Sequence, residues 1–289
     1  MRNRIQLFAA ILLASAVAGA EDGGSQLQSI LDRHAPSIVT VKAVLKFDVS
    51  TGGQAQSQES RMESQGVVVD ASGLIMVSSA LFSSEDLKEG LKLRGGNADV
   101  KVTPSDIKIV FEGEDKECEA FLAATDGKLG VAYLQVVDLG DKKLAALPSE
   151  GAKLAVGDKI AFVSRLKKGY DYAPYVETAT VAGQITKPRK AVLLDHDPGA
   201  MGLPAFNMAG EFAGVVVRVD AATDEDAEAA NAMRMIRMLL GRGNRAPSPT
   251  FLVGPDAIRG SVDLAKKEAE RLAVERANEK KEPPKEDPK

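Results

Sequence analysis

Short runs of β-branched and aromatic residues, separated by turns rich in Gly, Pro and Asp, recur along most of this chain. Runs of this length and composition are typical of β-strands. We expect strands at residues 37–45, 65–70, 73–77, 107–111, 118–123, 131–137, 159–163, 178–185, 191–194, 212–219 and 251–253. Many short strands favour a β-sandwich or β-barrel over a parallel α/β sheet. A chain of 289 residues has room for one large core or two moderate ones.

Helical patterns flank these strands. Residues 25–34 place Leu27, Ile30 and Leu31 on one helical face, and Pro36 ends the pattern. A charged helix follows the last strand, with Asp256 as its expected N-cap. The segment 50–60 consists mostly of Gly, Gln and Ser without apolar periodicity, so we predict a mobile loop there.

The first residues have the charged, apolar and small-residue regions of a secretory signal. Arg2 and Arg4 precede an apolar run over 7–17, and Ala18-Gly19-Ala20 stands before Glu21. This run is shorter than the roughly 20 residues that a spanning helix needs, which favours cleavage near Glu21 over a retained membrane anchor. We therefore expect export to a periplasm, to the extracellular space or to the cell envelope, without a stable membrane span after cleavage.

Charge and cysteine content exclude some classes of partner and cross-link. Removing residues 1–20, which carry two arginines and no acidic residue, changes the formal charge from −4 to −6. Nothing in this balance favours nucleic acid as a partner. Cys118 is the single cysteine, so the chain has no internal disulfide. We expect Cys118 to be a small apolar residue beside a strand and not a nucleophile.

One loop carries a family resemblance. Asp197-Pro198-Gly199-Ala200-Met201-Gly202-Leu203-Pro204 precedes the apolar run 215–217. It resembles the nucleophile loop N-P-G-N-S-G-G-P of trypsin-like serine proteases of the bacterial HtrA (Deg) type. The resemblance extends in order over roughly residues 30–272 and includes the paired strands at 66–70 and 73–77 and the segment 251–255. It implies a mainly β fold of two antiparallel six-stranded barrels of the chymotrypsin/trypsin type, with a short N-terminal helix and a charged C-terminal helix.

The resemblance also suggests a division of the chain. The segments are a signal peptide (1–20), the N-terminal helix with the first barrel (21–138), a linker (139–150), the second barrel (151–255) with an insertion at 221–248, the C-terminal helix (256–280) and a disordered tail (281–289). Met233, Ile236 and Leu240 follow helical spacing inside the insertion, which indicates a helix packed on the barrel or one that docks a partner. Too few residues follow Pro255 for the PDZ domain that often ends this family.

All three catalytic positions of the family are substituted here. The resemblance puts Ala80 in place of the histidine, Gly130 in place of the aspartate and Met201 in place of the serine. Acyl transfer of this kind needs a hydroxyl, an imidazole that takes its proton and a carboxylate that orients the imidazole. We therefore expect no catalytic residue, no cofactor and no metal. Backbone N–H groups of Gly199 and Met201 could remain as a vestigial oxyanion loop.

The chain has only two histidines, so a substitute base can be sought exhaustively. His34 is predicted to be a surface or helix-end residue. His196 lies between two aspartates just before the altered loop, and an arrangement of Ser78 or Ser79 as nucleophile with His196 as base is one alternative. Asp195, His196 and Asp197 lack the spacing that would bring their side chains to one face as metal ligands.

Leu203 replaces the second glycine of the family loop. We expect Met201 and Leu203 to fill the former pocket by packing, because exposed apolar side chains there would be unfavourable.

Three functions are compatible with these patterns. The first is an exported, catalytically inactive protease homologue that binds or scaffolds a protein or peptide, with an oligomer allowed. The second is an active serine-type endopeptidase or other hydrolase with a rearranged site, built on Ser78, Ser79 and His196. The third is a structural envelope protein. The fold alone does not choose among them.

Overall fold

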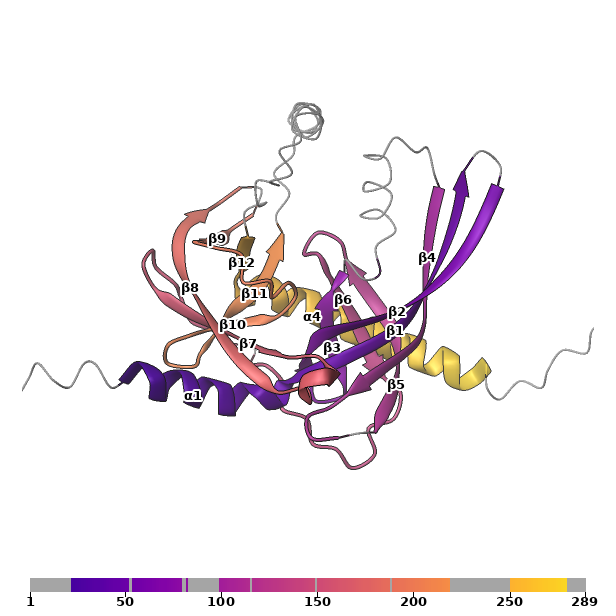
Figure 1. The fold of residues 1–289 in the computed structure, drawn as a ribbon, viewed down its shortest axis with the longest axis horizontal. Coiled ribbons are helices and arrows are strands. Elements are labelled where there is room, and N and C mark those ends of the chain that lie inside the picture. Colours follow the sequence, from indigo (N-terminus) through magenta and orange to yellow (C-terminus); the bar gives the residue numbers. More distant parts are fainter. Residues whose placement is uncertain are drawn as a thin grey trace, which may run out of the picture.

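The computed structural model describes residues 22–51, 54–79, 82, 99–114, 116–148, 150–187, 189–218 and 250–279. The predicted signal peptide, the insertion with its Met233 helix, the tail and Ala80 lie outside these ranges. Figure 1 shows two β-barrels side by side, flanked by helices. None of the helices in the described ranges is long and apolar enough to cross a bilayer.

Two closed antiparallel barrels of six strands each form the body of the molecule. The first, in the order β1-β2-β3-β6-β5-β4, consists of β1 (Ile38–Thr51), β2 (Gln54–Asp70), β3 (Leu74–Ser78), β4 (Asp99–Val110), β5 (Glu117–Asp126) and β6 (Val131–Val136). The second, in the order β10-β11-β12-β9-β8-β7, consists of β7 (Lys159–Arg165), β8 (Pro174–Ile185), β9 (Ala191–Leu194), β10 (Pro204–Asn207), β11 (Phe212–Arg218) and β12 (Thr250–Val253). This architecture confirms the predicted fold class.

Successive side chains of an apolar run pack into two different cores. In β3, Ile75 and Val77 point into the first barrel, whereas Leu74 and Met76 join a core shared between the barrels. Successive side chains of a strand face opposite sides of the sheet. A strand that is buried on both faces therefore reads as a continuous apolar run. In β7, Phe162 likewise faces the interior of the second barrel, and its neighbours face the shared core.

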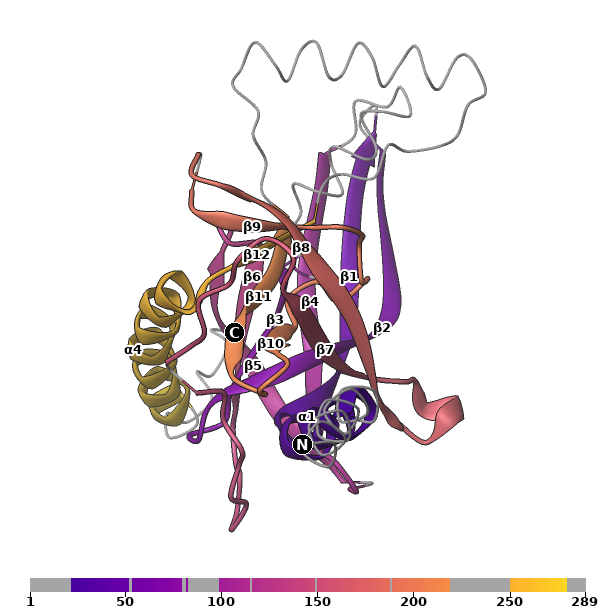
Figure 2. The ribbon, with the colours of Figure 1, turned by 90° about the vertical axis from the view of Figure 1, so that its left-hand side faces the viewer.

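The two α-helices in the described ranges pack against the barrels from outside. Helix α1 (Asp22–His34) continues into the 3-10 turn η1 (Ala35–Ser37) and then β1. Helix α4 (Pro255–Glu279) contacts β5 of the first barrel and β11 of the second. Figure 2 shows the two helices on separate sides of the body. Helix α4 begins one residue before Asp256, which lies in its first turn and is not the N-cap.

Polar contacts fix α4 to the first barrel. The Ser261 hydroxyl donates to Oδ2 of Asp126 at 2.8 Å, and the Lys266 ammonium donates to Oδ2 of Asp70 at 2.7 Å. Partial burial alone would raise the pKa of Asp70, but the hydrogen bonds from Lys266 and Ser72 lower it overall. Asp70 therefore stays ionised and holds the helix electrostatically.

Two expectations about strands were wrong or incomplete. The segment 50–60 is not a mobile loop, because β1 and β2 pair without interruption from Ile38↔Val67 to Thr51↔Gln54. Backbone pairing between β1 and β2 makes this segment a strand although its polar composition predicted none. The short strand β10 was not predicted. It starts at a proline and pairs with β7 and β11 immediately after the altered loop.

Candidate functional site

The loop between β9 and β10 forms two consecutive local turns. The Gly199 N–H donates to Oδ1 of Asp197 at 2.9 Å. The Leu203 N–H then donates to the carbonyl of Ala200 at 2.9 Å. Gly202, the third residue of this second turn, has φ +80°, which is the conformation that a type II turn requires and glycine adopts most readily.

The second turn is fixed to the second barrel. The Gly202 N–H donates to the Val216 carbonyl at 2.9 Å, and the Val216 N–H donates to the Leu203 carbonyl at 3.0 Å. Ala200 is 6% exposed and Leu203 3% exposed, and both belong to the core of this barrel. Met201 is partly buried and packs against the same core. The substituted residues thus act as packing, as we expected for Leu203 and Met201.

The same turn also abuts the first barrel. A Cβ placed on Gly202 would lie 2.6 Å from the Ser78 nitrogen and 3.0 Å from the Val77 carbonyl carbon. Gly202 therefore touches the end of β3 directly. The Ser79 N–H donates to the Gly130 carbonyl at 2.9 Å. The end of β3 is thus the point where the Met201 loop and Gly130 meet, and Ala80 follows Ser79 in the sequence.

Neither Met201 nor Gly130 carries a side chain that acyl transfer can use. Met201 carries a thioether without a transferable proton, and Gly130 has no side chain. Gly130 has φ +67°, in the left-handed region that glycine adopts most readily. The N–H of Gly199, one of two backbone donors expected for an oxyanion loop, is already engaged by the Asp197 carboxylate.

His196 forms a local pair with its neighbour. Its Nδ1 lies 2.8 Å from Oδ1 of Asp195, and the ring is about half exposed. The Thr180 N–H donates to the same carboxylate oxygen at 2.9 Å. This backbone hydrogen bond is the main cause of the lowered pKa of Asp195, and the His196 contact lowers it further. Because the ionised Asp195 carboxylate can only accept, Nδ1 of His196 carries the hydrogen of this contact. Nε2 is the ring nitrogen that this contact does not use.

His34 lies at the end of α1, as predicted, but it is buried and not on the surface. It is 6% exposed, and its ring stacks on Phe206 with centroids 3.7 Å apart. Its Nε2 lies 2.9 Å from the Gly210 carbonyl, to which it donates. Burial lowers the pKa of His34 despite this hydrogen bond. The ring therefore stays neutral and attaches α1 to the β10–β11 hairpin.

Sequence reasoning missed one buried arginine that joins the barrels. Arg165, at the end of β7, is 5% exposed. Its Nε donates to the Ile38 carbonyl at 2.8 Å and its Nη2 to the Ala35 carbonyl at 2.7 Å. Nη2 also pairs with Glu112 of the first barrel at 2.7 Å. An arginine in an apolar strand was the only sequence signal of this bridge.

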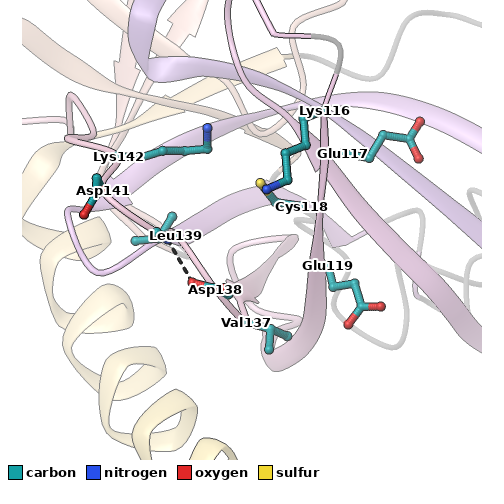
Figure 3. Close-up of a pocket in the computed structure, with 10 residues that line it drawn as sticks. Lys116, Glu117, Cys118, Glu119, Val137, Asp138, Leu139, Asp141 and Lys142 are labelled. Carbon is teal, nitrogen blue, oxygen red and sulfur yellow. Dashed lines mark hydrogen bonds between the residues drawn. The ribbon is translucent and has the colours of Figure 1, made fainter.

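A cavity of about 520 Å³ lies on the first barrel, between β5 and the segment that follows β6. Figure 3 shows Lys116, Cys118 and Lys142 among the residues that line it. Cys118 itself is buried and belongs to the first core, as predicted. The cavity is lined by residues 116–119 and 137–142, so it is separate from the Met201 loop and the end of β3.

The described residues contain no group of three or more His, Cys, Asp or Glu side chains able to hold a metal ion. Around His196, both aspartates are engaged by backbone donors: Asp195 by Thr180 and Asp197 by Gly199.

Comparison with known proteins gives a structural similarity only. No family model and no curated protein matches the chain. Among solved structures, the chain is similar to the crystal structure of Deg5, with 17% sequence identity and a TM-score of 0.47. The similarity covers 68% of this chain and 86% of the Deg5 chain. The two closed barrels themselves fit the trypsin-like fold that the resemblance to the HtrA type implied.

Proposed function

We propose that the protein is an exported, catalytically inactive trypsin-like protein that binds or scaffolds a protein or peptide partner. The observation that carries this proposal is Met201, on a turn packed between the second core and the end of β3. A nucleophile for acyl transfer needs a hydroxyl, thiol, amine or carboxylate. The family position for that group holds a thioether that contributes to packing instead.

The backbone around Met201 supports the same conclusion. The Gly199 N–H, one of the two donors expected for an oxyanion loop, already donates to Asp197. Donors that already have protein acceptors offer little stabilisation to a developing oxyanion. Leu203, almost fully buried beside them, anchors the turn in this arrangement.

The two histidines supply no evident replacement for the general base. His34 is stacked, buried and bonded to Gly210. His196 is held by Asp195, which also caps the Thr180 backbone. Loss of a triad serine or histidine leaves only about 10³–10⁴-fold catalysis over water.

A complementation experiment tests the proposal. Cells that lack the protein are given either the unchanged chain or a variant with Ser78→Ala, Ser79→Ala and His196→Ala. We expect both chains to rescue the deletion phenotype, because binding needs none of these side chains. Rescue by the unchanged chain but not by a stably folded variant contradicts an inactive protein. A single His196→Ala variant serves as the matched control for that residue alone.

One observation favours the second candidate, a hydrolase with a rearranged site. The Asp195–His196 contact orients an imidazole through Nδ1, as the carboxylate of a triad does. Ser78 and Ser79 lie at the end of β3. If this version is correct, purified protein hydrolyses ester or peptide substrates, and His196→Ala abolishes that rate. Unchanged hydrolysis in the His196→Ala variant excludes His196 as the base.

A further inference from the structure

Strands β1, β2 and β4 continue beyond the first barrel as a three-stranded arm. Among the described residues, β2 pairs with β3 only from Gly66 onward, and β4 pairs with β5 only over 108–110. Residues 54–65 of β2 and 99–105 of β4 therefore pair with β1 alone. Figures 1 and 2 show the arm projecting from the body, with β1 between β4 and β2.

The two edges of the arm differ in how they are protected. The β4 edge carries Pro104 and Asp106, which has φ +46°, and its register with β1 shifts between Lys42 and Val44. Prolines and irregularities of this kind prevent another strand from pairing. The β2 edge has no proline over 54–65, and its register with β1 has no shift.

A long, regular edge strand presents unpaired backbone N–H and C=O groups to another chain. Alternate residues of β2 direct these groups away from β1. Side chains 56–59 and Arg61 on this strand are exposed. Ser60 and Ser64 are partly exposed. The β2 edge is therefore accessible, polar and shaped for pairing.

The charges along this edge are self-complementary. Two β2 strands related by a two-fold axis at Ser60 would pair Glu59 of one copy with Arg61 of the other, and the reverse contact would repeat it. Glu59 and Arg61 share one face of the arm, because side chains of a strand alternate. Ser60 would face Ser60, and Gln58 would face Met62, on the opposite face. The same axis pairs residues 55–65 of both copies, which is nearly the whole free edge.

We propose that two copies of this protein associate through antiparallel pairing of their β2 edges about Ser60. The arrangement is isologous, so one patch serves both partners. Opposite charges directly across a strand pair stabilise it, and like charges destabilise it. The mainly polar side chains make this a reversible dimer whose specificity comes from backbone pairing and two Glu59–Arg61 contacts.

Cysteine cross-linking tests the register. Directly opposed residues of an antiparallel pair have Cα atoms about 4.5–5.5 Å apart, within the range of a disulfide. In a Cys118→Ala background, we expect Ser60→Cys to form an interchain disulfide under mild oxidation. Gln58→Cys, which faces Met62, and Thr103→Cys, on the β4 edge, are matched controls that should form little interchain disulfide. Equal cross-linking at all three positions, or none at Ser60→Cys, overturns the proposal.

Charge reversal tests the same contact without a cysteine. Glu59→Arg and Arg61→Glu each convert two attractive contacts into two repulsive ones, which should raise the dimer dissociation constant at least about tenfold. The double variant restores complementarity and should restore the dimer in sedimentation experiments. Circular dichroism monitors folding, since Glu59 also faces Lys46 within its own chain. A monomer at every concentration, or a dimer insensitive to both single reversals, contradicts the proposal.

Discussion

Leu203 gives the most direct stability test of packing in the loop between β9 and β10. It is 3% exposed in the core of the second barrel, and the turn that carries it is fixed by two hydrogen bonds to Val216. These bonds limit how far the backbone can collapse into a cavity. Leu→Ala at buried sites costs about 2–5 kcal/mol, so we expect Leu203→Ala to lower the free energy of unfolding by about 3 kcal/mol.

Urea unfolding followed by circular dichroism measures this change. A loss of about 3 kcal/mol corresponds to a Tm decrease of about 6–12 °C for a protein of this size. Leu264→Ala is the matched control, because Leu264 on α4 is 69% exposed and should change stability by less than about 0.5 kcal/mol. A Leu203→Ala variant as stable as the control would refute the interpretation of this loop as packing.

Three further changes probe the contacts around the loop and between the barrels. Gly202→Ala should lower the free energy of unfolding by at least about 2 kcal/mol, because the positive φ and the contact with Ser78 add together. Gly199→Ala, with a positive φ but open space around its Cβ, should lower it by about 1 kcal/mol. Equal losses in urea unfolding would contradict the close approach of Gly202 to Ser78. Burial lowers the pKa of His34 from its ordinary 6.5, so the unfolded chain binds more protons than the folded one, and stability falls as pH drops below about 6.5. His34→Gln should flatten this dependence of Tm on pH between pH 7 and 5.5. An unchanged slope would exclude His34 as its source. Arg165→Met leaves the backbone carbonyls of Ala35, Ile38 and Tyr172 without this donor and should cost about 2–4 kcal/mol. A neutral effect in the same assay would show that the bridge does not stabilise the barrels.

The strands were predictable where both faces are buried. Runs such as 74–77 and 131–134 are apolar throughout, because successive residues enter different cores. The number and spacing of such runs indicated an all-β sandwich or barrel, and the resemblance to the HtrA type implied the two barrels. The hairpin of β1 and β2 was not predictable from composition, because its outer half is rich in Gln and Ser and owes its structure to pairing with a central strand.

The sequence named the positions of the candidate site but could not give their geometry. The sequence pointed to Gly130 and Met201 as altered positions, and the structure brings their segments together at the end of β3. The contact between Gly202 and Ser78 joins residues far apart in the chain, so no local pattern encodes it. The position that the resemblance gives to the histidine, Ala80, remains a sequence-based prediction.

Hydrolysis by the purified mature protein tests the central claim most directly. The protein is incubated with unfolded casein and, separately, with a serine-reactive phosphonate, and both reactions are followed by mass spectrometry. An inactive protease homologue leaves casein intact and acquires no phosphonate adduct. Casein cleavage that the phosphonate blocks, together with an adduct on Ser78 or Ser79, would contradict the account.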